Sequence, residues 1–192
     1  MNNNEEKIVD ILDGAVGEYS RIASELEDQK RIAADSTRDI EERIEAFEDI
    51  IDSQVGDTPL VRTRNLEREF GFRQLFLKFE GGNPSGTQKD RIAFAQAMDG
   101  LRRGYDAITL ATCGNYGVAC AFAASLAGLR CLVFLPENFH TKRLKEMEEL
   151  GAEIIRTPGD YEQAVVTSQG ACIQRDNPGR DIQGIFKSLP QG

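Results

Sequence analysis

The sequence predicts an α/β protein, a parallel sheet with helices on both faces in three αβα layers, preceded by an acidic helical N-terminal arm. After residue 60, short β-branched apolar runs alternate with helical patterns. Two of these runs end in glycine-containing turns from which a helix starts. Alternation of this kind is typical of parallel sheets, whose strands are joined by crossover helices.

The arm is predicted to hold two amphipathic helices, because its apolar residues recur every three or four positions. The first series is Ile8, Ile11, Leu12, Val16, Tyr19, Ile22 and Leu26, and the second is Ile40, Ile44, Phe47, Ile50 and Ile51. We expect a break at Asp35-Ser36-Thr37, with Ser36 or Thr37 capping the second helix. The apolar stripes cover either an exposed edge or helix face of the body, or a second copy or a docking partner.

The body is predicted from the order of its apolar runs and helical patterns. We expect strands at 60–63, 74–79, 107–111, 130–135 and 153–156, and helices at 89–102, 115–127, 141–150 and 160–174. The chain then divides into an arm (1–54), an α/β lobe (55–175) and an irregular tail (176–192).

Charge is concentrated in the arm. Residues 1–58 hold 6 Lys/Arg and 17 Asp/Glu, a net charge of −11, and the remaining residues hold 17 and 15, a net charge of +2, which together give the −9 of the whole chain. This acidity disfavours nucleic acid and anionic membranes as partners. The nearly neutral body suits a small anionic ligand such as an amino acid.

Several compositional features favour a cytoplasmic protein. No apolar run approaches the roughly 18 residues of a membrane span. The acidic start MNNNEEKIVDILDG lacks the basic and apolar regions of a secretion signal. The four cysteines, at positions 113, 120, 131 and 172, form no CxxC pair and favour free thiols. One histidine, His140, makes histidine triads and multi-histidine metal sites poor hypotheses.

The first candidate site is the turn EGGNPSGTQKDR at residues 80–91, between a predicted strand and a predicted helix. It ends in Lys89 at the helix start, where backbone N–H groups favour anions. An amine in this place can hold a phosphorylated aldehyde as a Schiff base. The alternative is an ordinary solvated lysine in the first turn of a helix.

The second candidate site follows the next strand, at Thr112-Cys113-Gly114-Asn115-Tyr116-Gly117. Ligands lie beyond the carboxyl ends of parallel strands, so two such turns can converge on one crevice. The glycines allow close approach of the backbone, and the Asn115 amide can bond a ring oxygen. Alternatively, Asn115 is an N-cap and the glycines serve only the turn or helix packing.

Taken together, these segments resemble the fold-type II pyridoxal-phosphate enzymes of the tryptophan synthase β superfamily. The resemblance runs from about Val55 to Gln169 and includes GDTPLV (56–61), the lysine turn, the asparagine turn, LRCLVFLPE (129–137) and LKEMEELGAEIIRTPGDYEQA (144–164). It implies pyridoxal 5′-phosphate as the cofactor and Lys89 as the residue that condenses with the cofactor aldehyde. It also implies that Asn115 bonds the ring oxygen O3′ and that Thr112, Cys113, Gly114 and Tyr116 receive the substrate carboxylate.

The sequence departs from the family pattern at Gln88, where the family has a hydrophobic residue, and at Cys113, where it has a small hydroxylated one. The family's glycine-rich phosphate loop and its partner for the pyridine nitrogen are not found after Ala171. We therefore expect a chain that lacks the second lobe. It is a fragment, one piece of a split enzyme, or a lobe that kept only an interaction role.

The resemblance implies elimination and replacement chemistry on an amino acid. Threonine synthase, which converts phosphohomoserine to threonine, is the first choice of subfamily on AGLRCLVFLPE and GDYEQA, and cysteine synthase is the alternative on NPSG and KDRIA. A non-catalytic assembly or interaction lobe is the rival of another class. Expected partners are an amino-acid substrate and either a second copy or a complementing chain.

Overall fold

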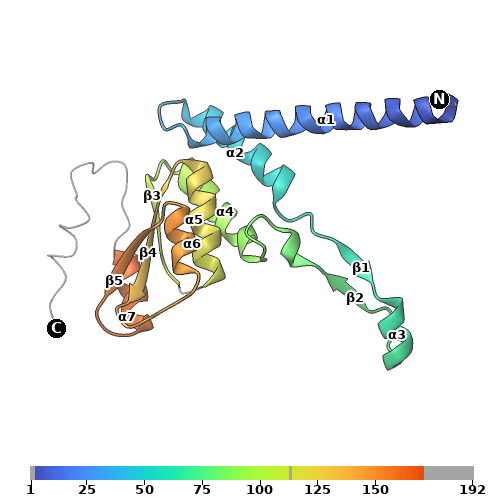
Figure 1. The fold of residues 1–192 in the computed structure, drawn as a ribbon. Coiled ribbons are helices and arrows are strands. Elements are labelled where there is room, and N and C mark those ends of the chain that lie inside the picture. Colours follow the sequence, from blue (N-terminus) through green and yellow to red (C-terminus); the bar gives the residue numbers. More distant parts are fainter. Residues whose placement is uncertain (1–2, 113, 171–192) are drawn as a thin grey trace.

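The computed structural model describes residues 3–112 and 114–170. Figure 1 shows the path of the chain from the projecting helix α1 to α7 beside the sheet. The elements are α1 (Asn3–Ala34), α2 (Ile40–Gln54), β1 (Leu60–Arg62), α3 (Arg64–Phe70), β2 (Phe76–Lys78), a 3-10 turn η1 (Glu80–Gly82), α4 (Lys89–Arg102), β3 (Ala107–Ala111), α5 (Asn115–Ala127), β4 (Arg130–Pro136), α6 (Leu144–Glu149), β5 (Glu153–Thr157) and α7 (Tyr161–Gly170).

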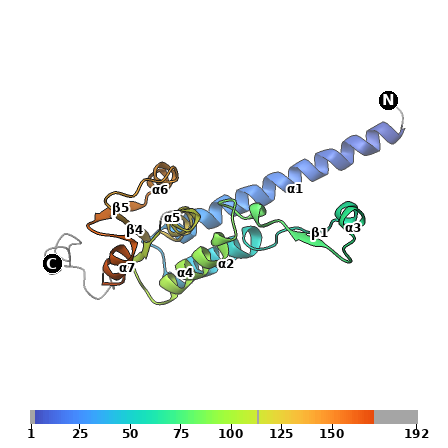
Figure 2. The same cartoon turned by 90° about the horizontal axis from the view of Figure 1, so that it is seen from below.

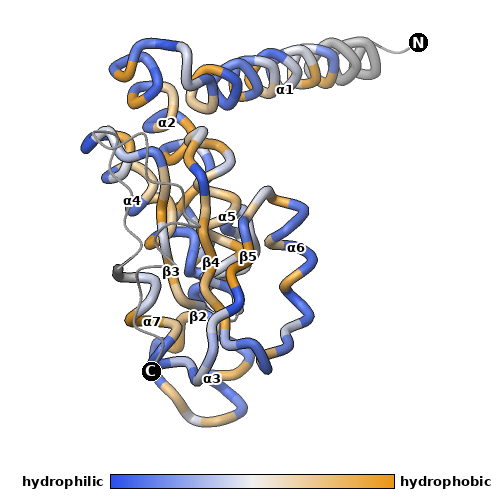
Figure 3. Tube along the Cα trace, turned by 90° about the vertical axis from the view of Figure 1, so that its left-hand side faces the viewer, coloured by the Kyte–Doolittle hydropathy of each residue, from blue (hydrophilic) through white to orange (hydrophobic). Residues whose placement is uncertain are grey.

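The body is a parallel sheet in the order β3-β4-β5 with helices on both faces, which confirms the predicted fold class. Successive side chains of β4 point to opposite faces, so Val133 joins the core under α4 and α5 while Leu132 and Phe134 pack with Ala164 of α7. Figure 2 shows β4 between α5 and α7, and Figure 3 shows the apolar run along β4. A strand buried on both faces is typical of a central parallel strand.

The prediction that the first two strands join this sheet was wrong. β1 and β2 pair antiparallel with each other, Val61 opposite Leu77, and form a separate two-stranded ribbon. The helix α3 in their connection was not predicted. The connection, residues 63–75 with α3 inside it, is long enough for a parallel crossover, so its length did not decide the pairing. The ribbon and its connection stand away from the sheet (Figures 1 and 2) and expose large apolar side chains, namely Leu60, Val61, Phe70, Phe72, Phe76, Leu77 and Phe79.

The two predicted arm helices are present, and the break between them falls near Asp35 as expected. The predicted cap was wrong, because Asp39 is the N-cap of α2. Its carboxylate accepts a hydrogen bond from the Glu41 backbone N–H at 2.8 Å. Thr37 instead donates its backbone N–H and its hydroxyl to Asp35. Asp39 lies directly before the helical residues and therefore takes the capping role.

Other boundaries differ little from the predicted ones. The helix expected from residue 141 begins at Leu144, and the last helix is described from Tyr161 to Gly170. The predicted tail at 176–192 lies outside the described residues. None of the helices within the described ranges combines the length and the hydropathy that a membrane span needs.

A buried arginine joins the arm to the body. Arg43 of α2 donates from Nε to the Ala33 carbonyl at 3.1 Å and from Nη2 to the Ala127 carbonyl at 2.7 Å. These carbonyls belong to the last turns of α1 and α5, where helices leave acceptors unsatisfied and favour cations. Gly128 adopts φ +63° against Ala34, so close that an added Cβ would lie 2.3 Å from the Ala34 carbonyl oxygen. The ends of α1 and α5 are therefore fixed to each other.

Replacing Arg43 with alanine is expected to lower the free energy of unfolding by about 2–4 kcal/mol, because it leaves buried helix carbonyls without a donor. The measurement is urea unfolding followed by far-UV circular dichroism. Arg31→Ala is the matched control, since the Arg31 and Asp28 side chains are exposed and their ion pair contributes at most about 0.5 kcal/mol. An equal loss of unfolding free energy in the two variants would contradict the role given to Arg43.

Candidate functional site

The lysine turn runs from η1 to the first residue of α4. Gly86 adopts φ +82°, a conformation that favours glycine. The Ser85 backbone N–H donates to Asp90 Oδ2 at 2.9 Å, and the Lys89 backbone N–H donates to Thr87 Oγ1 at 3.2 Å. Asp90 is fully buried in the first turn of α4, where a carboxylate is favoured by the helix dipole. These bonds fix the direction in which the turn enters the helix.

Lys89 is the first residue of α4 and is half-buried. Within the described part of the chain, its side-chain nitrogen has no hydrogen-bond or ion-pair partner. Lys78, in contrast, donates to the Thr58 carbonyl at 2.5 Å. Lys89 is therefore placed on a rigid element with an amine that the fold itself does not engage.

A polar network that sequence reasoning missed holds the lysine turn against the ribbon. Arg91 donates to both carboxylate oxygens of Glu80, at 2.9 and 3.1 Å, and to the Gly56 carbonyl at 2.6 Å. Asn83, nearly fully buried, accepts from the Gly56 N–H and donates to Glu80. The Arg91 guanidinium lowers the pKa of Glu80 and keeps it ionised. Nothing in the sequence analysis indicated this network, because it depends on side-chain geometry.

The asparagine turn joins β3 to α5. Thr112 is buried directly after β3, Gly114 is the N-cap of α5, and Asn115 is its first residue and is exposed. Asn115 is therefore not the cap, and its amide makes no hydrogen bond to a described residue. Cys113 lies outside the described residues.

Tyr116 points back to α4, where its hydroxyl hydrogen-bonds Gln96 Oε1. Burial raises the pKa of this phenol, so the hydroxyl keeps its proton. Because it is engaged in the contact between α4 and α5, the Tyr116 side chain helps to hold the turn in place. Its predicted contact with a substrate carboxylate remains a prediction.

Gly117 allows α5 to begin close to its neighbours. A Cβ at this position would lie 2.7 Å from Thr112 Cγ2 and 2.7 Å from Met147 Cε. This close packing supports the alternative interpretation of Gly117, that it serves helix packing. An added Cβ at Gly114 would meet nothing within 4 Å, so space around that residue is open.

Lys89 and Asn115 begin two helices that pack against each other. Phe94 of α4 and Phe122 of α5 form an edge-on ring pair with centroids 6.0 Å apart, and Tyr116 reaches Gln96. The lysine turn lies beside α5, because Pro84 and Ser85 line a cavity together with Val118 and Phe122. The two turns are therefore carried by one helix pair, α4 and α5.

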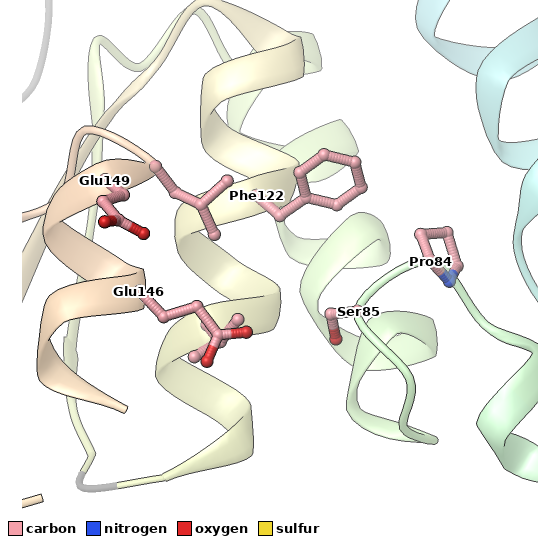
Figure 4. A pocket seen from close by; sticks show the side chains of 7 residues that line it. Pro84, Ser85, Phe122, Glu146 and Glu149 are labelled. Carbon is pink, nitrogen blue, oxygen red and sulfur yellow. The ribbon is translucent and has the colours of Figure 1, made fainter. Parts of the chain in front are cut away.

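That cavity has a volume of about 280 Å³ and opens between the lysine turn, α5 and α6 (Figure 4). Neither Lys89 nor Asn115 is among its lining residues, while Glu146 and Glu149 are. Two carboxylates disfavour a phosphate, so this cavity does not suit an anionic cofactor group. The cavity lies between the lysine turn and α6, and it is not the predicted crevice on which the lysine and asparagine turns would converge.

Two cysteines lie in the core of the lobe and have no place in the proposed chemistry. Burial raises the pKa of the Cys120 thiol to about 12 and also raises the pKa of Cys131. Both are free and buried, so they stay protonated and unreactive at neutral pH. This agrees with the prediction that they are free thiols.

Comparison with known proteins gives the family. Residues 51–182 match the family described as "Pyridoxal-phosphate dependent enzyme". The chain belongs to this family. The tryptophan synthase β type expected from the sequence is confirmed, and the cofactor is pyridoxal phosphate.

Several relatives match over about 110 residues. The chain is 38% identical to cystathionine beta-synthase of Oryctolagus cuniculus, over 55% of this chain and 20% of the relative. It is 36% identical to cysteine synthase B of Escherichia coli, over 55% and 36%, and 33% identical to threonine synthase of Methanocaldococcus jannaschii, over 57% and 27%. The chain therefore spans roughly a fifth to a third of the length of these relatives.

Solved structures agree on the fold. A pyridoxal 5′-phosphate-dependent aspartate racemase is 24% identical with a TM-score of 0.57, over 68% of this chain and 42% of that one. A mutant of O-ureido-L-serine synthase with O-ureido-L-serine bound is 26% identical with a TM-score of 0.52, over 61% and 38%.

The residues of the two turns fit the aldehyde end of the cofactor. The Lys89 amine and the Asn115 amide are both without partners among the described residues, and the position of Gly114 leaves open space. Two buried oxygens of the lysine turn, Ser85 Oγ and Asp90 Oδ1, likewise lack a partner there. A free amine can form a Schiff base with an aldehyde, and a free amide can hydrogen-bond a ring hydroxyl. The open space at Gly114 allows such a compound to approach the backbone.

Replacing Gly117 with alanine is expected to lower the free energy of unfolding by about 1–3 kcal/mol, because Thr112 and Met147 must shift to admit the methyl group. Gly17→Ala is the matched control, because a methyl group at this exposed position of α1 meets nothing within 4 Å, and it should not lower this free energy. Both variants can be compared by urea unfolding. A Gly117→Ala chain as stable as the control would contradict the close packing described here.

Proposed function

We propose that this chain supplies the lysine-bearing part of a pyridoxal-phosphate-dependent enzyme that carries out elimination or replacement on an amino acid. The observation that carries the proposal is Lys89, an unengaged amine at the start of α4 in a chain of this family. The acidic arm (1–54), the lobe (55–175) and the tail (176–192) remain our proposed division of the chain.

In this proposal, the lysine turn holds the cofactor, and the asparagine turn binds its ring oxygen and the substrate carboxylate. Lys89 holds the cofactor through its aldehyde, and Asn115 donates its amide to the ring oxygen. Thr112, Cys113, Gly114 and Tyr116 receive the substrate carboxylate. When bound, the cofactor takes up the electron pair left at the substrate α-carbon. When it is not bonded to the cofactor, the Lys89 amine would take the proton from that carbon and later return it.

The proposal includes a further polypeptide segment that completes the site. Relatives are three to five times as long as the part of them that this chain matches. The ribbon is joined to the lysine turn by the Glu80–Arg91 network and exposes apolar side chains on both strands. Two strands alone bury too little apolar surface to be stable, which supports a covering segment beside Lys89.

For the substrate, we propose a serine that carries a leaving group on its β-carbon, which a nucleophile then replaces. Cystathionine beta-synthase and cysteine synthase B are the more similar of the relatives described above, at 38% and 36% identity. The threonine synthase reaction on phosphohomoserine is the second candidate, supported by the 33% identity to that enzyme and by the AGLRCLVFLPE and GDYEQA segments. The competing hypothesis is that the chain is a non-catalytic lobe with an assembly or interaction role.

Pyridoxal phosphate added to the purified chain and then reduced with borohydride is expected to label Lys89 in preference to other lysines. Peptide mapping by mass spectrometry measures the labelled position. Lys145 is the internal control, because its side chain is 84% exposed and lies in no turn of the site. Lys89→Ala should remove the preferred label, and Lys145→Ala should leave it unchanged. Equal labelling of Lys89 and Lys145 would favour the non-catalytic rival.

Substrate class can be tested on the cofactor-loaded protein by its visible absorbance. O-ureido-L-serine is expected to change the absorbance of the lysine-bound cofactor, because a substrate amine displaces Lys89, and phosphohomoserine at equal concentration is expected not to. Loaded Lys145→Ala protein should respond in the same way. A response to phosphohomoserine alone would favour the threonine synthase reaction, and no response to either compound would contradict both.

A further inference from the structure

The free part of α1, residues 12–25, carries an apolar stripe that is open to solvent. The stripe consists of Leu12, Val16, Tyr19 and Ile22, whose exposed fractions are 58, 64, 75 and 51%. Figure 1 shows this part of α1 projecting beyond α2 and the body. It precedes residue 51, where the family match begins, so the cofactor site has no part in it.

The stripe continues a face that is buried further along the same helix. Leu26 and Ala33 of α1 pack into the core with α2 and α5. Leu12 and Tyr19 lie fourteen and seven residues before Leu26, and α-helical positions seven apart share one face. The face that contacts the body at one end of α1 therefore reaches solvent at the other end.

Two glycines make the free part of α1 dependent on contacts with that face. Gly14 and Gly17 lie inside the helix, and a Cβ at either position would meet nothing within 4 Å, so no close neighbour requires a glycine there. Glycine is a poor helix former, and helices in proteins are stabilised mainly by packing of their apolar face. A partner that covers the stripe would therefore stabilise this part of the helix.

Carboxylates border the stripe on both sides. Residues three or four apart are neighbours on a helix surface, so Glu18 and Glu25 lie beside Ile22, and Asp13 lies beside Val16. All three carboxylate residues are exposed. Within the described part of the chain, Asp13 makes no hydrogen bond or ion pair. The borders of the stripe are therefore negative and accessible to a partner.

The positive charge nearby does not neutralise these borders. Arg21 is the one Lys or Arg among residues 12–25, and it donates to Glu18 and to Glu25 at 2.6 Å. Residues 1–28 hold eight Asp/Glu and two Lys/Arg, a net charge of −6. A second copy of this helix, an anionic lipid surface or a nucleic acid would bring like charge against the stripe. A partner with cationic borders is complementary to it.

We propose that the free part of α1 docks a basic amphipathic α-helix of another protein. The apolar side chains of that helix cover the stripe, and its lysines or arginines meet the carboxylates on either side. Helices recognised in this way present anchors at positions i, i+3 or i+4, and i+7. The apolar contact supplies affinity, and the charges select the partner and increase the rate of association.

The probe is a fluorescent synthetic peptide of leucine and lysine, about 18 residues or five helical turns long, with its leucines on one face. Binding to the full chain is measured by fluorescence anisotropy. A matched peptide with glutamate in place of every lysine is the control. We expect the lysine peptide to bind and the glutamate peptide not to, and sodium chloride to weaken binding by screening. Equal binding of the two peptides, or binding of neither, would overturn the proposal.

A charge placed inside the stripe separates docking from simple attraction. Val16→Asp makes the arm more negative, so a peptide held by charge alone would bind this variant more tightly. We expect binding about tenfold weaker, because the new carboxylate would be buried against leucines. Ser24→Asp adds the same charge at an exposed position away from the stripe and should bind the peptide at least as well as the parent chain. Circular dichroism checks that both variants keep their helix. Undiminished binding to Val16→Asp would contradict docking on the stripe.

The borders are tested by removing their charges. The double variant Glu18→Gln, Glu25→Gln should bind the lysine peptide more weakly and with a smaller salt dependence, whereas Asp28→Asn, away from the stripe, should change binding little. A double variant that binds like the parent chain would overturn the role of the borders.

Other occupants of the stripe give different results. Sedimentation equilibrium should show the same oligomeric state for the parent chain and for Val16→Asp. A parent dimer that Val16→Asp dissociates would show that a second copy covers the stripe, and binding to anionic vesicles that Val16→Asp abolishes would show a lipid surface. Either result would overturn the proposal. None of these outcomes depends on Lys89 or on the cofactor.

Discussion

The contact between the last turns of α1 and α5 fixes the arm to the helix that begins at the asparagine turn. Arg43 donates to carbonyls of both helices, and Gly128 allows Ala34 to approach α5 closely. A buried guanidinium is costly unless hydrogen-bond acceptors surround it. Arg43 finds these acceptors only because α1 and α5 end next to each other. From that point α5 runs to the asparagine turn, and α1 runs away from the body. The arm thereby depends on the same buried group that anchors the site-bearing helix.

The lobe and the ribbon are stabilised in different ways. The parallel sheet is covered on both faces, by α4 and α5 on one side and by α7 on the other, and its central strand is almost wholly buried. The ribbon has neither face covered, and polar bonds to the lysine turn hold it in place. Apolar surface that remains in water weakens folding, so the ribbon is the less stable of the two.

Local sequence patterns predicted the elements whose structure is decided locally. The helices 89–102 and 115–127 and the strand 107–111 have the predicted bounds, because glycine turns and apolar periods mark both ends. The pairing of β1 with β2 could not be predicted in this way, since it depends on which other strands are present to pair. The cap at Asp39 and the Arg91 network also depend on side-chain geometry that spacing alone does not define. Among the site residues, the sequence located Lys89 and Asn115 at helix starts but gave no indication that Gln96 engages Tyr116.

The position of the reactive amine is controlled by residues that have no chemistry of their own in the proposed reaction. Asp90 ties the turn to the first residues of α4, and Arg91 ties the same helix to the ribbon through Glu80. Lys89 directly precedes both of these residues and donates its backbone N–H to Thr87 Oγ1, so its backbone is held while its side chain stays unengaged. A lysine that must alternate between a cofactor and a substrate proton needs this combination, because a fixed backbone keeps the reach of the amine constant while the side chain rotates. The sequence KDR thus joins one free amine to two structural anchors.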